Sequence, residues 1–125
     1  MKSAQQKVRD FHVAFDIPSI SFPSKISSGA IARRMALINE ETAELYVAMH
    51  MGDLIGIADG LADLLYVVLG TAVEYGIEIE PIFNEVHRSN MSKVGGTKRE
   101  DGKLIKPATY SPANLEPLIR QQLGH

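Results

Sequence analysis

The chain of 125 residues contains no cysteine and no tryptophan, and its 13 basic residues occur in no run longer than two. Without cysteine, the protein has no disulfide, no thiolate zinc site and no cysteine nucleophile. The scattered basic residues and the formal net charge of -2 give no footprint for a nucleic-acid polymer. We therefore expect a cytoplasmic protein that binds no nucleic acid.

Signals for export, membrane insertion and several common chemistries are also missing. The first residues, 1–7, are polar where a signal peptide would be apolar. The most apolar stretch, residues 55–73, contains Asp59 and Asp63, each of which would cost about 2.5 to 3.5 kcal/mol at a bilayer centre. The chain has no phosphate-binding Gly-x-x-x-x-Gly-Lys-Ser/Thr loop, no Glu-x-x-His pair and no His-Glu-x-x-His motif. We expect a soluble protein that is neither a P-loop protein, a di-iron carboxylate bundle nor a zinc protease.

Hydrophobic residues make up 45% of the chain and charged residues 22%, as in ordinary globular domains. The periodicity of the apolar residues predicts an all-α fold, an antiparallel bundle of four main helices with a short C-terminal tail helix, completed by oligomerisation. The expected helices cover residues 2–15, 30–50, 54–75, 81–93 and 111–123. Residues 1–125 form one domain, in which residues 1–29 are an N-terminal helix and loop and residues 94–125 are a tail and candidate lid.

Local signals set the expected boundaries of these helices. Ser27 or Ser28 caps the second helix, and Gly52-Asp53 closes it and caps the third. A turn this short makes these two helices antiparallel. Ser111-Pro112 opens the last helix, and Asp101-Gly102 favours a small hairpin before it.

The third expected helix, residues 54–75, is apolar on nearly every side. Such a helix belongs at the centre of a bundle or in a dimer interface. Gly60 and Gly70 disfavour a helix by about 1 kcal/mol each relative to alanine, so they indicate close approach of a neighbouring element.

Two acidic clusters lie on the second and third helices. At 100 degrees per residue, Glu40, Glu41 and Glu44 project from one side of the second helix. We interpret Asp59 and Asp63 as the only charges on a third helix that otherwise belongs inside. Carboxylates that converge repel one another unless a cation joins them, and Mg²⁺ prefers oxygen ligands. A Mg²⁺ or Mn²⁺ site joining both clusters would support phosphoanhydride hydrolysis by a metal-activated water.

Simpler interpretations of the same residues remain open. The Glu-Glu-x-x-Glu pattern alone is more often a solvated acidic stripe. The two aspartates also have a structural alternative, an ion pair with Arg33 or Arg34 one helix away, which would make the protein a plain structural dimer.

These motifs resemble those of the all-alpha NTP pyrophosphohydrolases, the MazG-like superfamily. The resemblance covers residues 35–93 and rests on Glu41-x-x-Glu44 followed by a second acidic motif that opens Asp63-Leu64-Leu65-Tyr66. The stretch from His87 to Lys93 and the sequence Asp101-Gly102-Lys103 are similar to a phosphoribosyl-ATP pyrophosphohydrolase-like branch.

The resemblance implies a Mg²⁺-dependent enzyme that splits a nucleoside triphosphate, or a related nucleotide, into the monophosphate and pyrophosphate. It also implies a homodimer or homotetramer. The implied metal ligands are Glu41, Glu44, Asp59 and Asp63, and Glu40 acts behind them or as general base. The family's ExxD motif would place a glutamate at Gly60, or at Gly56, so we expect the Asp59-x-x-x-Asp63 pair to replace it.

On the fourth helix, Phe83, Val86 and His87 define an expected inward side that includes Asn90 and Lys93. Asn90 and Lys93 suit contacts to the sugar and phosphates of a substrate, and the alternative is that they cap the helix and complement its dipole.

His12 and Phe15 suit either stacking on a base or a place in the core, and we favour the core. For the whole protein, the alternative function is a helical protein that binds a nucleotide or a partner without turnover.

Overall fold

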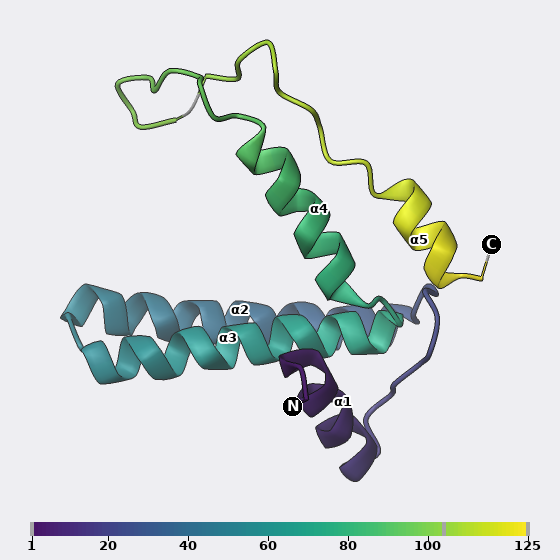
Figure 1. Ribbon diagram of the computed structural model, residues 1–125. Coiled ribbons are helices and arrows are strands. Elements are labelled where there is room, and N and C mark those ends of the chain that lie inside the picture. Colours follow the sequence, from purple (N-terminus) through teal and green to yellow (C-terminus); the bar gives the residue numbers. More distant parts are fainter. Residues whose placement is uncertain (1, 104, 125) are drawn as a thin grey trace. The chain divides into compact units, whose positions relative to one another are not determined.

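The computed structural model describes residues 2–103 and 105–124, and within that part the chain has five helices and no strand. The predicted all-helical fold is therefore confirmed. The helices are α1 (Ala4–Ala14), α2 (Ser28–Met51), α3 (Leu54–Tyr75), α4 (Ile79–Met91) and α5 (Glu116–Gln122) (Figure 1). The chain forms two compact units, residues 1–77 and 78–125.

Helices α2 and α3 form an antiparallel hairpin, as the capping signals predicted (Figure 1). Ser27 Oγ accepts a hydrogen bond from the backbone N–H of Ala30 at 3.1 Å, which satisfies one of the free donors at the start of α2. Gly52 ends α2 with a φ of 65 degrees, a left-handed conformation that costs glycine little. Asp53 then caps α3 by accepting a hydrogen bond from the N–H of Gly56 at 3.0 Å.

The two glycines that interrupt α3 lie where other elements come close. A Cβ atom at Gly60 would lie 3.2 Å from Cα of Leu45 on α2. At Gly70 it would lie 2.9 Å from Arg34 Nη2 and 3.0 Å from His12 Nε2. The prediction that these glycines mark close approaches is confirmed.

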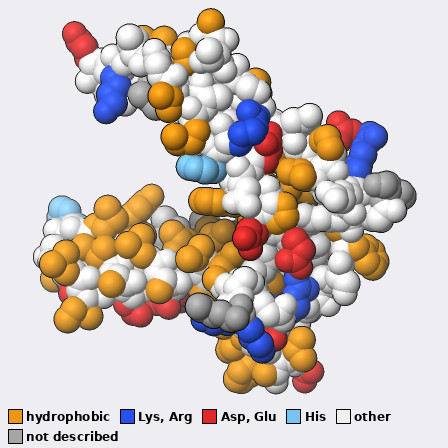
Figure 2. All heavy atoms as spheres, viewed as in Figure 1, with side chains coloured by type: hydrophobic (Ala, Val, Ile, Leu, Met, Phe, Trp, Pro, Cys, Tyr) orange, Lys and Arg blue, Asp and Glu red, His pale blue; other side chains and the backbone are white. Residues whose placement is uncertain are grey.

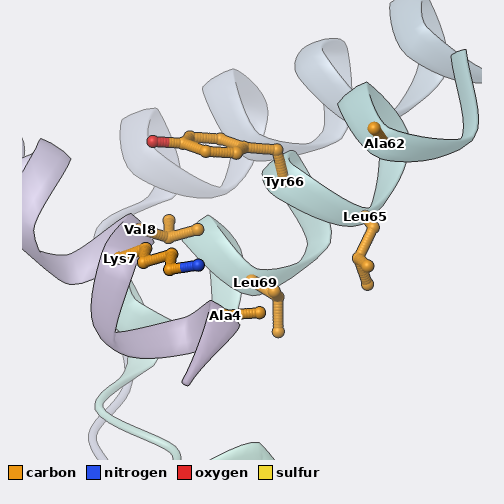
Figure 3. Close-up of a pocket in the computed structure, with 7 residues that line it drawn as sticks. All are labelled: Ala4, Lys7, Val8, Ala62, Leu65, Tyr66 and Leu69. Atoms are coloured by element: carbon orange, nitrogen blue, oxygen red, sulfur yellow. The ribbon is translucent and has the colours of Figure 1, made fainter. Parts of the chain in front are cut away.

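Helix α1 packs against the second half of α3 and closes the small core of this unit, whose buried apolar residues are Val8, Leu45, Leu69, Ala72 and Val73. Gln5 fastens the start of α1 by donating from Nε2 to the carbonyl of Ile77 at 2.7 Å. Between α1 and α3 remains an apolar hollow of about 150 Å³, in which Val8 faces Leu69 and Lys7 supplies the charged group (Figure 3).

The first half of α3 is not buried within this chain, contrary to the expectation of a central helix. Leu54 is 79% exposed and Ile55 84%, and Leu61 and Leu65 are also exposed. Leu54 and Ile55, together with the exposed Met49 and Met51 of α2, form an apolar face at the free end of the hairpin (Figure 2). By length and composition α3 could also cross a membrane, a test that core helices of soluble proteins pass as well.

In the second unit, hydrogen bonds join α4 to the tail, and the observed helix boundaries differ from the predicted ones. Helix α4 begins at Ile79, two residues before the predicted start at Pro81, and Gln122 of α5 bonds both the N–H and the carbonyl of Glu78 at 2.9 Å. Helix α5 begins at Glu116, so the predicted start at Ser111 is wrong. The N–H of Ser111 instead donates to Ser92 Oγ at 2.8 Å, and its carbonyl accepts from Arg88 at 3.4 Å.

The predicted hairpin at Asp101-Gly102 is a closed turn rather than a pair of regular strands. Gly102 has a φ of 86 degrees, and the N–H of Arg99 donates to the carbonyl of Lys103 at 2.8 Å. Leu104, within this loop, lies outside the described residues.

Candidate metal and active site

The contact between Leu45 and Gly60 sets the register in which the two acidic clusters meet. Glu41 lies one turn before Leu45 on α2, so both share the face toward α3. Because α3 runs in the opposite direction, the position facing Glu41 lies one turn after Gly60, which is the position of Asp63. The helix hairpin therefore brings Glu41 and Asp63 together.

Glu41 is the carboxylate of this cluster whose pKa is raised by burial and by the others. Burial raises the pKa of its carboxyl group, and the nearby negative charges of Glu44, Asp63 and Glu40 raise the pKa further. Its Oε2 atom is buried and finds no hydrogen-bond partner among the described residues. A buried, unpartnered carboxylate oxygen next to three other carboxylates is the place where a cation would stabilise the site most.

The other predicted ligands lie around Glu41 with different exposure. Asp63 is half-buried, whereas Glu40, Glu44 and Asp59 are exposed, and Asp59 lies one helical turn before Asp63.

The donor set has the chemistry of a Mg²⁺ site, because every ligand would be an oxygen. The described residues nevertheless include no group of three or more histidine or acidic side chains already arranged around a metal position. Glu44 and Asp63 already lie close to Glu41, so binding would require the exposed Asp59 side chain to turn toward them.

The ion pairs of Arg33 and Arg34 correct two expectations. Both arginines pair with Glu74 of α3: Arg33 Nη2 lies 2.5 Å from Oε1, and Arg34 Nε lies 3.3 Å from Oε2. Glu74 is 1% exposed, so α3 carries a third charged residue, and this one is fully buried. The interpretation of Asp59 and Asp63 as the only charges of this helix, and their proposed pairing with the two arginines, are both wrong.

Arg34 is also held by neutral groups of α3, since it donates to Thr71 Oγ1 at 3.2 Å and to the carbonyl of Val67 at 3.3 Å. The glutamate missed by sequence reasoning could have been found from its place at the end of an apolar helix that faces the Arg33-Arg34 pair.

A second hollow, of about 210 Å³, begins one turn from the acidic cluster. Helix α2 contributes Arg34 and Leu37, which precedes Glu41 by one turn, and the other lining residues are Phe11, His12, Ile17, Tyr66 and Val67. The ring of Phe11 meets that of Tyr66 edge-on, with centroids 5.6 Å apart. The hollow thus combines aromatic surface with polar groups from three helices.

His12 and Phe15, both expected in the core, have different environments. His12 is buried, and its Nδ1 lies 3.0 Å from the carbonyl of Pro18, which favours the tautomer with the proton on Nδ1. Phe15 is 66% exposed and stacks on Phe11 with a centroid distance of 4.6 Å. The core prediction is confirmed for His12 and wrong for Phe15.

Asn90 and Lys93 lie at the end of α4 in the second unit. Lys93 Nζ donates to Asn90 Oδ1 at 3.0 Å, so the two predicted substrate contacts form one polar pair. The residue that caps the helix is Ser92, not Asn90. Phe83, Val86 and His87 are exposed, which differs from the expected inward side.

Comparison with known protein families agrees with this geometry. Residues 8–90 match the family model described as phosphoribosyl-ATP pyrophosphohydrolase. The matched segment begins in α1, includes the acidic residues of α2 and α3, and ends at Asn90 in α4. Members of this family are pyrophosphohydrolases that typically depend on a divalent metal. The match covers more than half of the chain, which therefore belongs to the phosphoribosyl-ATP pyrophosphohydrolase family of the MazG-like, all-alpha NTP pyrophosphohydrolases.

Proposed function

We propose that this chain uses Mg²⁺ to hydrolyse a nucleoside triphosphate, or a related nucleotide, to the monophosphate and pyrophosphate. The observation that carries this proposal is the buried Oε2 of Glu41, which has no partner among the described residues and lies in a cluster of carboxylates. Such an oxygen destabilises the fold unless it serves a cation. The chain keeps it at the centre of its helix hairpin.

Glu41, Glu44 and Asp63 would hold the metal, with Asp59 as a fourth ligand. A bound Mg²⁺ supplies charge stabilisation to phosphate oxygens and lowers the pKa of a bound water. Glu40 precedes Glu41 in α2 and acts as the general base that accepts the proton of the attacking water. Mn²⁺ has the same preference for oxygen ligands and would substitute for Mg²⁺.

The aromatic hollow next to the carboxylates suits the base of the nucleotide. Phe11 and Tyr66 offer ring surfaces for stacking, and Arg34 and His12 offer polar edges. Asn90 and Lys93 supply an amide and an ammonium group for the sugar and phosphates.

A second copy of the chain covers the apolar face at the free end of the α2–α3 hairpin, giving a homodimer or homotetramer. Leu54 and Ile55 are the most exposed large apolar residues of this face, and an isolated monomer would leave them in water. Sedimentation equilibrium of the wild type and of Ile55→Glu tests this, because the substitution should dissociate the oligomer. A wild-type chain that stays monomeric at high concentration would contradict it.

The direct test of the activity is a panel of NTPs and dNTPs with Mg²⁺, in which pyrophosphate release is measured. Glu44→Gln keeps the size of the side chain and removes its charge, so it should lower turnover by roughly 100-fold or more. Glu80→Gln, the same change at an exposed position of α4, is the matched control and should leave turnover unchanged. Full activity in Glu44→Gln would refute the site.

One observation favours a second candidate function, nucleotide binding without turnover. Gly60, or Gly56 if Asp59 is the aspartate of the motif, stands where the family motif has a glutamate, and the backbone of Gly60 packs on Leu45. If the missing carboxylate is required for catalysis, the protein will bind Mg²⁺-nucleotide tightly and release no pyrophosphate across the whole panel. Calorimetric titration on the same samples separates the two functions.

A further inference from the structure

Two lysine side chains of the second unit are directed at one aromatic ring. Lys106 Nζ lies 4.6 Å from the centroid of the Tyr110 ring, and Lys93 Nζ lies 5.8 Å from it. Both distances are within the range of about 6 Å at which an ammonium group is attracted to a ring face. Lys93 follows α4 directly, whereas Lys106 belongs to the tail, so residues distant in sequence meet here.

Backbone hydrogen bonds hold this arrangement in place. The N–H of Tyr110 donates to the carbonyl of Pro107 at 3.0 Å, which closes a turn and places Lys106 beside the ring. The N–H of Ser111 donates to Ser92 Oγ at 2.8 Å, which ties Tyr110 to the residue that precedes Lys93. The chain therefore holds both ammonium groups within about 6 Å of the centre of the Tyr110 ring.

The charges around the ring are not balanced. Neither Lys93 nor Lys106 forms an ion pair within the described part of the chain, and the polar partner of Lys93 is the neutral amide of Asn90. Arg88 also lies near Tyr110: its contact with Glu85 raises the pKa of the guanidinium, and the Tyr110 phenol adds a smaller effect. Three cationic side chains thus lie near one ring, and of these Arg88 is paired with a carboxylate, that of Glu85.

We propose that Lys93, Lys106 and Tyr110 form a binding site for a diphosphate anion, with the tail supplying Lys106 as a phosphate ligand. Ammonium groups held near each other repel, and an anion with several negative charges and many acceptor oxygens relieves that repulsion best. A nucleic-acid polymer is disfavoured because the chain has a net charge of -2. That the diphosphate belongs to the substrate or the product rests on the proposed function.

The test is calorimetric titration of the full chain with inorganic pyrophosphate in the presence of EDTA. Without metal, the carboxylates of α2 and α3 repel the anion, so binding reports on the basic site alone. Lys106→Gln should weaken binding about tenfold, as expected for loss of one charge-assisted hydrogen bond, and Lys106→Arg should retain most of it. Tyr110→Leu should also weaken binding, because it removes the ring that positions the lysines, whereas Tyr110→Phe should not.

Lys98→Gln is the matched control, since it removes the same charge from an exposed position of the same tail. Equal losses in Lys98→Gln and Lys106→Gln would show a diffuse charge effect and overturn the proposal, as would binding of pyrophosphate no tighter than that of sulfate. If no nucleotide is hydrolysed but the pattern of pyrophosphate binding holds, only the proposed enzymatic function fails. If hydrolysis occurs and Lys106→Gln changes neither KM nor pyrophosphate affinity, only the tail site fails.

Discussion

Glu74 and Glu41 lie on the facing helices of one hairpin, and their surroundings differ in a way that separates structure from function. Glu74 is fully buried and meets the guanidinium groups of Arg33 and Arg34. Among the described residues, one buried oxygen of each glutamate, Oε2, lacks a hydrogen-bond partner. Arg34 lies 3.3 Å from Oε2 of Glu74, whereas the charged neighbours of Glu41 are carboxylates. A charge that serves the fold is neutralised by the fold, whereas a charge kept for a ligand is left for the ligand to neutralise.

The largest expected effect is the loss of stability on removing Glu74, the carboxylate that is paired with two arginines. Glu74→Ala leaves Arg34 buried without its carboxylate partner, so it should lower the free energy of unfolding by about 3 kcal/mol. Urea denaturation followed by circular dichroism measures this, with Glu80→Ala as an exposed control. A loss below about 1 kcal/mol would mean that the bonds of Arg34 to Thr71 and Val67 suffice, and the contrast with Glu41 would then disappear.

Removing the charge of Glu41, whose charged neighbours are carboxylates, is expected to increase stability. The pKa of Glu41 is raised above 4.5, so the folded protein binds this proton more tightly than the unfolded chain does. The ionised carboxylate therefore disfavours folding at neutral pH, and this penalty disappears as the pH falls through the raised pKa. Without metal, Glu41→Gln should stabilise the protein at neutral pH by about 0.5–1 kcal/mol, with the gain shrinking toward pH 4.5.

Thermal unfolding in EDTA across this pH range measures the stability difference between Glu41→Gln and the wild type. The same scans with Mg²⁺ test whether the metal binds at Glu41. Mg²⁺ should raise the Tm of the wild type and not that of Glu41→Gln. A variant less stable than the wild type at every pH would show that Glu41 has a structural partner after all.

The smallest effect is expected at Glu85, a half-buried carboxylate near the surface, which like Glu74 pairs with an arginine. Arg88 lowers the pKa of Glu85 to about 2, and the N–H of Asn114 adds to the shift. This contact favours the folded state above pH 4.5 and is lost as the pH falls toward 2.

Glu85→Gln should increase hydrogen exchange at the Asn114 amide by less than about tenfold, because the exposed guanidinium of Arg88 leaves the pair screened by solvent. A change that spreads to the amides of α2 would contradict this local role.

Much of the hairpin could be predicted from sequence because local chemistry determines it. Ser27, Gly52 and Asp53 act on backbone groups within three residues, so their roles do not depend on distant packing. Gly60 and Gly70 were also identifiable, because glycine in a helix is costly unless a neighbour needs the space.

Features that depend on distant partners were harder to predict. Ser111 looked like a helix cap, but its N–H is bound by Ser92, nineteen residues earlier in the chain. Glu74 was visible as a charge at the end of an apolar helix, but its pairing with arginines about forty residues away depends on packing. The exposure of Leu54 could not be judged without knowing what covers α3.

The contact at Gly60 also limits how this site can change by mutation. Gly60→Glu would add a sixth carboxylate to the cluster, and its Cβ would lie 3.2 Å from Cα of Leu45, so α2 would have to give way by a few tenths of an ångström. A change at Leu45 alone would open a cavity in the small core. Because the two residues are in contact, we expect their substitutions to have non-additive effects on stability. We therefore expect a glutamate at position 60 to require a second substitution at Leu45.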